Sequence, residues 1–208
     1  MILSHSKNFT FVHTYKTGGT SVRSALRAYR DRPSLIKIAL SKLNIIDLQT
    51  HAPAKQIKKR YPCEWSKYFT FAFVRNPWSW QVSLYFFTLQ AEYNHHHEAV
   101  KSLDSFRDYI HWRVDGHKQF LSDFVFNEDG QRLVDYVGRL ETLHRDFEEI
   151  CKQTGVDAAL PHKNKSEHRD YREYYDDETR ELVAQHFAPD IDAFGYCFDG
   201  IREGVQIN

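Results

Sequence analysis

The sequence of 208 residues has no excess of either charge, because 28 Lys and Arg residues balance 28 Asp and Glu residues. No overall field therefore favours nucleic acid or an anionic membrane, and any recognition of an anion must be local. A long apolar run is also missing: the longest stretch without charge, residues 76–91, contains Asn, Pro, Ser and Gln and is not a membrane span. The first residues lack the basic region and apolar run of a secretory signal.

Cysteine is equally scarce. The three cysteines, Cys63, Cys151 and Cys197, are odd in number and far apart, which argues against a disulfide framework or a zinc knuckle and indicates free thiols in a reducing compartment. The consecutive histidines at 95–97 cannot all face one metal ion from a helix. We therefore expect a cytoplasmic protein with no membrane span, no nucleic-acid partner and no metal.

Aromatic residues, in contrast, are abundant: they make up 15% of the chain, and hydrophobic residues make up 41%, which suits a globular core. The length suits a single domain. Aromatic and β-branched runs predict strands at 8–14, 68–75 and 133–138. The spacing of apolar residues predicts helices from residue 20, at 53–60, 78–89 and 105–113, from residue 143 to an end at Gly155, and at 177–187. This alternation predicts an α/β fold, a P-loop-like sandwich with a central, mostly parallel sheet flanked by helices.

The sharpest local pattern is a loop between the first predicted strand and helix. Two adjacent glycines allow a tight turn that aims successive N–H groups at one point, and a lysine and three hydroxyl groups surround them. Such a loop is a candidate phosphate cradle formed by Lys16, Thr17, Gly18, Gly19, Thr20 and Ser21. The alternative is a plain strand-to-helix turn whose Ser and Thr side chains only cap the helix.

A second pattern follows the strand at 68–75. Arg75 ends that strand and can offer a bidentate fork to a phosphate. Asn76 and Pro77 are typical of a helix start, and Ser83 lies two turns into the helix on the side of Asn76 and Ser79. Alone, Arg75 would be interpreted as a surface ion-pair residue.

The two patterns together resemble the PAPS-dependent sulfotransferases, more closely their carbohydrate branch of the heparan and chondroitin type. The order Lys-Thr-Gly-Gly-Thr-Ser is similar to the 5′-phosphosulfate-binding loop of that family, although Tyr15 stands where the family usually has proline. The segment from Arg75 to Ser83 is similar to the family's 3′-phosphate element. Looser similarity at 137–143, 160–166 and 190–196 extends the resemblance through a single sulfotransferase domain over 1–208.

The resemblance implies PAPS as sulfuryl donor, 3′,5′-ADP as product, no metal, and a hydroxyl-bearing acceptor such as a glycan or glycolipid. It also implies that a late basic loop closes over the 3′-phosphate, with Lys163, Lys165 and Ser166 as candidates. A solvated charged loop is the alternative for these three residues.

Sulfuryl transfer needs a base for the acceptor proton and a cation for the leaving phosphate. Lys16 is the expected cation. His51 is the expected base, because it lies at an element end, an imidazole suits neutral pH, and similar family members carry a histidine at this place. A capping or core role for His51 is the alternative; His13 and Glu64 are the rival bases.

Two other functions compete with this prediction. A kinase or nucleotide triphosphatase would want an Asp at the end of the second strand to hold Mg²⁺, where this chain has Arg75, and its lysine would follow the glycines. A non-catalytic PAP-binding module would keep the cradle without turnover. For an acceptor, Trp65, Trp80 and Trp112 could stack on sugars, and Arg23, Arg27 and Arg30 could meet acidic groups, or these residues could belong to the core and to a solvated helix face.

Overall fold

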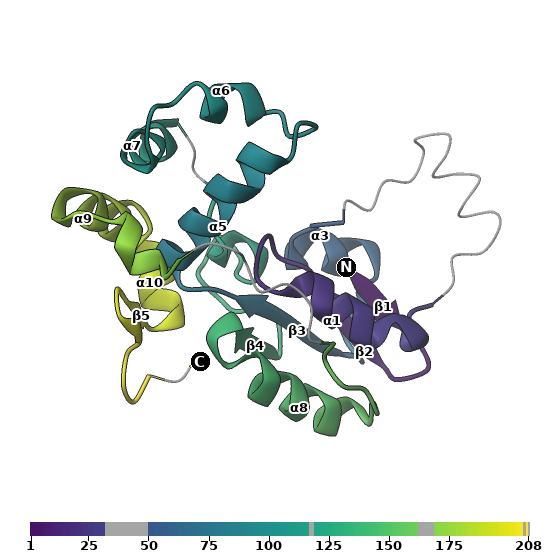
Figure 1. Cartoon of the computed structure of the whole chain (residues 1–208). Coiled ribbons are helices and arrows are strands. Elements are labelled where there is room, and N and C mark those ends of the chain that lie inside the picture. The colour runs from purple at the N-terminus through teal and green to yellow at the C-terminus, as the bar shows by residue number, and fades with distance from the viewer. Residues whose placement is uncertain (32–49, 117–118, 162–168, 206, 208) are drawn as a thin grey trace. The chain divides into compact units, whose positions relative to one another are not determined.

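The structure, a computed structural model, describes residues 1–31, 50–116, 119–161, 169–205 and 207 (Figure 1). The chain forms two compact units. The first contains Met1–Val74 and Asp123–Lys163, and the second contains Arg75–Ser122 and Asn164–Asn208. None of the helices in the described ranges is both long and apolar enough to cross a membrane.

The first unit is built on a sheet of four strands. Their order in the sheet is the order in the chain: β1 (Ile2–Ser4), β2 (Phe9–Val12), β3 (Phe69–Val74) and β4 (Tyr136–Arg139). β2, β3 and β4 are parallel, and β1 is antiparallel to β2. The predicted α/β fold with a mostly parallel sheet is confirmed, whereas the short edge strand β1 was not predicted.

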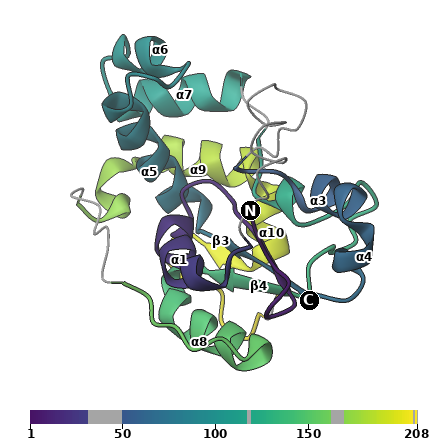
Figure 2. The same cartoon turned by 90° about the vertical axis from the view of Figure 1, so that its right-hand side faces the viewer.

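Alternation along the strands decides which helices cover which face. Phe9 and Phe11 of β2 and Phe71 and Phe73 of β3 share one face and are fully buried in the core of this unit. That face packs against helices α1 (Gly19–Ala25) and α8 (Leu143–Thr154). The opposite face carries smaller side chains such as Thr70 and Ala72. Figure 2 shows α3 (Ala54–Arg60) and α4 (Pro62–Trp65) on that other side of the sheet.

Several helix ends in this unit follow the sequence. α8 is followed by Gly155, whose φ of 61° is the left-handed value predicted for a glycine after a helix. α3 begins at Ala54, one residue after Pro53. The first helix is shorter than expected, because α1 passes at Leu26 into a 3-10 turn, η1 (Leu26–Tyr29). Further 3-10 turns are η2 (Ser122–Phe124) and η3 (Leu140–Thr142).

The second unit is mainly helical. Its elements are α5 (Pro77–Gln90), α6 (His97–Lys101), α7 (Phe106–Gly116), η4 (Tyr171–Tyr174), α9 (Asp177–His186), α10 (Ala188–Phe194) and a hairpin of β5 (Tyr196–Cys197) and β6 (Gly200–Ile201). α5 was expected to bury one face, yet Trp80 and Gln81 are fully buried as well. The reason is that α6, α7, η4 and α9 all pack against it.

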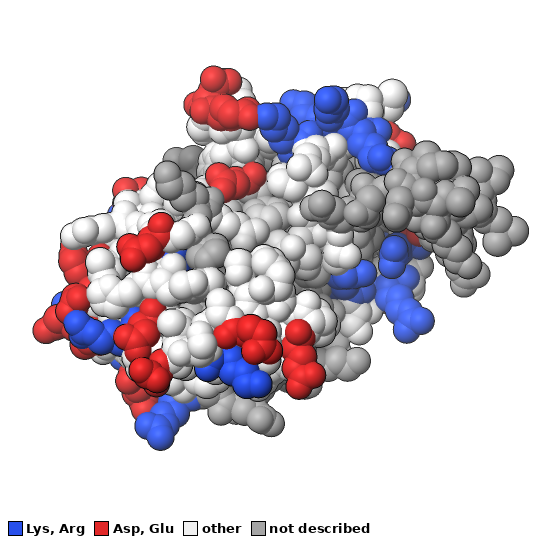
Figure 3. Space-filling view, turned by 90° about the horizontal axis from the view of Figure 1, so that it is seen from above, with Lys and Arg blue, Asp and Glu red and all other residues white. Residues whose placement is uncertain are grey.

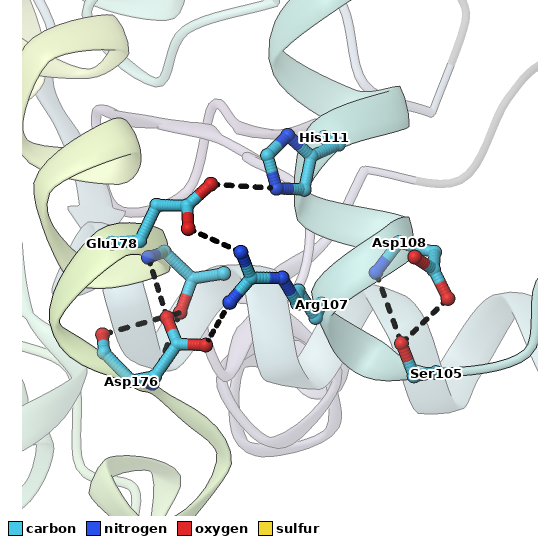
Figure 4. A network of polar contacts seen from close by, with 7 residues as sticks. Ser105, Arg107, Asp108, His111, Asp176 and Glu178 are labelled. Atoms are coloured by element: carbon cyan, nitrogen blue, oxygen red, sulfur yellow. Dashed lines mark hydrogen bonds and ion pairs between the residues drawn. The ribbon is translucent and has the colours of Figure 1, made fainter.

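A charged network joins two helices of this unit (Figure 4). Arg107 of α7 donates hydrogen bonds to Asp176 and Glu178 at the start of α9, and His111 Nε2 lies 3.3 Å from Glu178 Oε1. Asp176 also forms a capping box with Thr179. Because these charged side chains are largely exposed, we attribute their effect to orienting α7 and α9 more than to stability.

Candidate functional site

The loop between β2 and α1 is tied to the sheet by two buried threonines. The hydroxyls of Thr14 and Thr17 lie 2.7 Å apart, and both side chains are fully buried. Thr14 also donates a hydrogen bond to the main-chain oxygen of Phe73 on β3. The loop is therefore anchored to the neighbouring strand. We had expected the Thr17 hydroxyl to face a phosphate. Because that hydroxyl is used in this anchor, a contact of Thr17 with a phosphate would instead come from its main chain.

The main chain of the loop turns through left-handed conformations. Lys16 has a φ of 57° and Gly18 a φ of 80°; the positive φ is strained for lysine and favourable for glycine. Gly18 then serves as the N-cap of α1, and its carbonyl accepts from Ser21 N at 3.0 Å. The backbone is thus locally strained at Lys16. Such strained residues are often found at functional sites.

Gly19 is required for a different reason. A Cβ atom there would lie 2.1 Å from Nε2 and Cδ2 of His13, so a side chain cannot fit. The start of α1 therefore lies directly on the His13 ring. Within this helix start, Thr20 is exposed and Ser21 is buried.

His51 sits beside this loop with a defined orientation. Its Nδ1 lies 2.9 Å from the main-chain oxygen of His13, and since a carbonyl only accepts, Nδ1 carries the proton and Nε2 the lone pair. Burial of the ring lowers the pKa of His51; the charges of the Met1 amino group and Arg23 lower it further, while the bond to His13 opposes them. The ring is therefore neutral at pH 7, with Nε2 able to accept a proton.

The two rival bases have other surroundings. His13 is buried, and burial lowers its pKa to about 3, so it stays neutral, and its Nδ1 has no hydrogen-bond partner among the residues that the structure describes. Glu64 lies in α4, where its Oε1 is 3.5 Å from His5 Nε2. The orienting hydrogen bond distinguishes His51 from both.

In the second unit, Arg75 follows β3 directly and is held by the next helix. Its side chain is buried, and its Nε donates to Ser79 Oγ at 2.9 Å. Ser83, four residues further along α5, is also buried. Ser79, which lies four residues from both Arg75 and Ser83, is the residue that holds the Arg75 side chain, and this four-residue spacing was the sequence signal for it.

Asn76 fixes this junction from both sides. Its Oδ1 accepts from Trp78 N at 3.1 Å and Ser79 N at 3.4 Å, which confirms the predicted helix cap. Its Nδ2 donates to the main-chain oxygens of Cys197 and Gly200 in the β5–β6 hairpin. One amide thus ties the start of α5 to the end of the chain.

Comparison with known proteins identifies the family of this chain. The model of the sulfotransferase family matches residues 1–197. The chain belongs to the sulfotransferase family. No curated protein sequence matches it. The crystal structure of the mouse sulfotransferase SULT7A1 complexed with PAP has a TM-score of 0.56 and 13% identity, covering 91% of this chain and 86% of that one. At this identity the likeness concerns the fold, and it confirms the predicted sandwich.

The remaining candidate residues of this sulfotransferase-family chain differ in whether the structure describes them and in how far they are buried. Lys163, Lys165 and Ser166 lie outside the described residues. Trp80 is fully buried, which excludes it as an exposed sugar platform, whereas Trp65 and Trp112 are half-buried. The described ranges contain no group of three or more His, Cys, Asp and Glu side chains suited to a metal ion.

The helix that follows His51 in the sequence exposes several basic side chains. α3 exposes Lys55, Lys58, Lys59 and Arg60, and Figure 3 shows Lys and Arg side chains gathered at one edge of the face seen from above. Of the arginines on the first helix, Arg27 and Arg30 are exposed, while burial lowers the pKa of Arg23.

Proposed function

We propose that this protein transfers a sulfuryl group from PAPS to a hydroxyl group of a carbohydrate acceptor. Membership of the sulfotransferase family supports the reaction type. The observation that carries the proposal is the oriented, neutral His51, whose Nδ1 is held by the His13 carbonyl beside the lysine–glycine loop. The carbohydrate acceptor is supported by the resemblance of the loop sequence to the carbohydrate branch.

The donor is assigned to the two strand-to-helix junctions by residue type. The mouse sulfotransferase of similar fold was crystallised with PAP, the 3′,5′-ADP product expected from PAPS. In the proposal, Lys16 and the main chain of residues 17–21 bind the 5′ end, and Arg75 and Ser83 bind the 3′-phosphate. Both sets of donors suit phosphate oxygens, because cationic and N–H donors make the strongest bonds to such acceptors. Lys163, Lys165 and Ser166 remain predicted contacts.

The proposed chemistry is one in-line displacement. The acceptor oxygen bonds to sulfur as the bond from sulfur to the 5′-phosphate oxygen breaks. His51 Nε2 takes the acceptor proton. Lys16 stabilises the negative charge that develops on the departing phosphate oxygen. The products are the sulfated acceptor and 3′,5′-ADP, and no oxidant, reductant or metal ion enters the balance.

A two-stage experiment tests this proposal. Calorimetric titration compares 3′,5′-ADP with ATP, and 3′,5′-ADP is expected to bind more tightly. Sulfur-labelled PAPS is then incubated with acidic and neutral glycans, glycolipids and small phenols, and label is expected in a glycan. Tighter binding of ATP would contradict the donor, and label confined to phenols would contradict the acceptor class.

His51→Ala separates an enzyme from a non-catalytic binding module. We expect kcat to fall about 10²- to 10⁴-fold, the usual contribution of a general base, while the affinity for 3′,5′-ADP stays within about twofold. The exposed His95→Ala is the matched control and should match the wild type in both measurements. Unchanged turnover in His51→Ala would exclude His51 as the base.

A further inference from the structure

Tyr15 is the one residue of the loop that departs from the family sequence, and the structure places its ring on His51. The two ring centroids are 3.8 Å apart and the planes differ by 20°, a stacked pair. The His13 ring lies at 4.2 Å from the His51 ring, tilted by 41°. His51 therefore contacts one aromatic ring from the residue before Lys16 and another from the strand side of the loop.

These contacts divide the task of holding the imidazole. The hydrogen bond from Nδ1 to the His13 carbonyl fixes one ring atom, but rotation about that bond would still swing Nε2. Packing of rings against the imidazole fixes its plane and thereby the direction of the Nε2 lone pair. Tyr15 is itself supported, because its ring meets Phe124 edge-on with the centroids 6.0 Å apart.

We propose that Tyr15 is a positioning residue that orients His51 for proton transfer by stacking on its ring. The inference rests on the proposed function, since it takes His51 as the base. It gives the substitution of tyrosine for the usual proline a specific role: a proline ring can stiffen the loop, but only an aromatic ring can stack on an imidazole through its π face. A misdirected base lowers the rate without changing how the donor binds.

Stacking also excludes water from the His51 ring. Besides burial, the groups that act on its charge are the main-chain oxygen of His13, the amino group of Met1 and Arg23. All of these groups remain when Tyr15 is replaced by a smaller residue. The substitution therefore removes only the aromatic ring that covers the His51 imidazole. Burial is the largest cause of the lowered pKa of His51; water entering after removal of the Tyr15 ring should raise that pKa. The acid limb of kcat then moves to higher pH, because only the neutral imidazole accepts a proton.

Three substitutions separate stacking from other roles of Tyr15. Tyr15→Phe keeps the ring and should retain kcat within about twofold. Tyr15→Leu removes the ring, and Tyr15→Pro restores the family residue; both should lower kcat about tenfold and move the acid limb up by roughly 0.5 unit. All three should keep the Kd for 3′,5′-ADP within about twofold. Tyr93→Leu, at a tyrosine that is 85% exposed, is the matched control and should behave as wild type.

The measurements are kcat and KM from pH 5 to 9, calorimetry with 3′,5′-ADP, and NMR titration of the His51 imidazole. Wild-type kcat and pH profile in Tyr15→Leu would overturn the inference. Wild-type behaviour of Tyr15→Pro alone would also overturn it, by showing that loop stiffness is sufficient. A tenfold loss of 3′,5′-ADP affinity in Tyr15→Leu would overturn it by assigning Tyr15 to the donor loop.

The same series distinguishes failure of the inference from failure of the proposed function. If His51→Ala lowers kcat and the Tyr15 variants do not, only the inference fails. If His51→Ala leaves kcat unchanged, the proposed base fails. The NMR titration needs no activity: a higher His51 pKa in Tyr15→Leu and Tyr15→Pro, but not in Tyr15→Phe, supports ring cover, and equal values in all variants contradict it.

Discussion

The two strand-to-helix junctions of this protein, where we propose that the donor binds, are built from different kinds of groups. The β2–α1 loop is made mainly by the main chain: left-handed Lys16 and Gly18, and a Gly19 with no space for a side chain. The β3–α5 junction has no glycine and is made by side chains, with Asn76 capping the helix and Ser79 holding Arg75. A loop built from main chain depends on its glycines, whereas a junction built from side chains depends on single polar groups.

The first prediction compares the loss of the cation at each junction, Lys16 in the β2–α1 loop and Arg75 at the β3–α5 junction. We expect Lys16→Ala to lower kcat about 10²- to 10³-fold, as loss of a transition-state donor does, and also to weaken 3′,5′-ADP binding. Arg75→Ala should act mainly on the Kd for 3′,5′-ADP, by about 10- to 100-fold, because a charged hydrogen-bond donor contributes about 1.5–3 kcal/mol. Steady-state kinetics at saturating PAPS and calorimetry measure the two effects.

Lys101→Ala, an exposed lysine on α6, is the control for charge alone and should change neither constant. The distinction between the two cations would be lost if Arg75→Ala lowered kcat at saturating PAPS as much as Lys16→Ala.

The second prediction concerns stability at the side-chain junction. Asn76→Ala removes a cap from two N–H groups and a donor from two carbonyl groups, and should lower the free energy of unfolding by about 1–3 kcal/mol. Urea unfolding followed by tryptophan fluorescence measures the change. Gln90→Ala, at the exposed end of the same helix, should stay within about 0.5 kcal/mol of wild type. An equally small effect of Asn76→Ala would show that the cap is dispensable.

The third prediction concerns the effect of pH on stability through His13, which lies beneath the β2–α1 loop. His13 has a pKa of about 3 when folded and 6.5 as a free side chain, so below pH 6.5 the unfolded chain binds a proton that the folded chain does not. Its contribution to stability is complete above pH 6.5 and is lost as the pH falls toward 3, by about 1.4 kcal/mol per unit. Unfolding in urea between pH 7.5 and 5 measures this slope.

His13→Gln should remove this part of the pH dependence, and the difference from wild type isolates it from the contribution of His51. His95→Gln is the matched control. A slope equal to that of wild type in His13→Gln would mean that His13 is not held neutral beneath Gly19.

Most of the sheet and both junctions could be predicted because their signals are local. β2 and β3 are runs of aromatic and β-branched residues, and Asn76 with Pro77 is a helix start in any context. β1, α10 and the β5–β6 hairpin were not predicted. Each is short, and β1 and the hairpin exist through pairing with a neighbour rather than through their own periodicity. The burial of Trp80 was left open because it depends on helices distant in the sequence.

The sequence by itself determined the lysine–glycine loop, the helix start after Arg75 and the α/β class, because spacing over a few residues controls turns, caps and strand faces. Only the tertiary structure decided how the His51 imidazole is held. His51 receives its orientation from the carbonyl of His13 and its cover from Tyr15, contacts between residues far apart in the chain. No local pattern encodes them, since they arise when the folded sheet brings distant segments together.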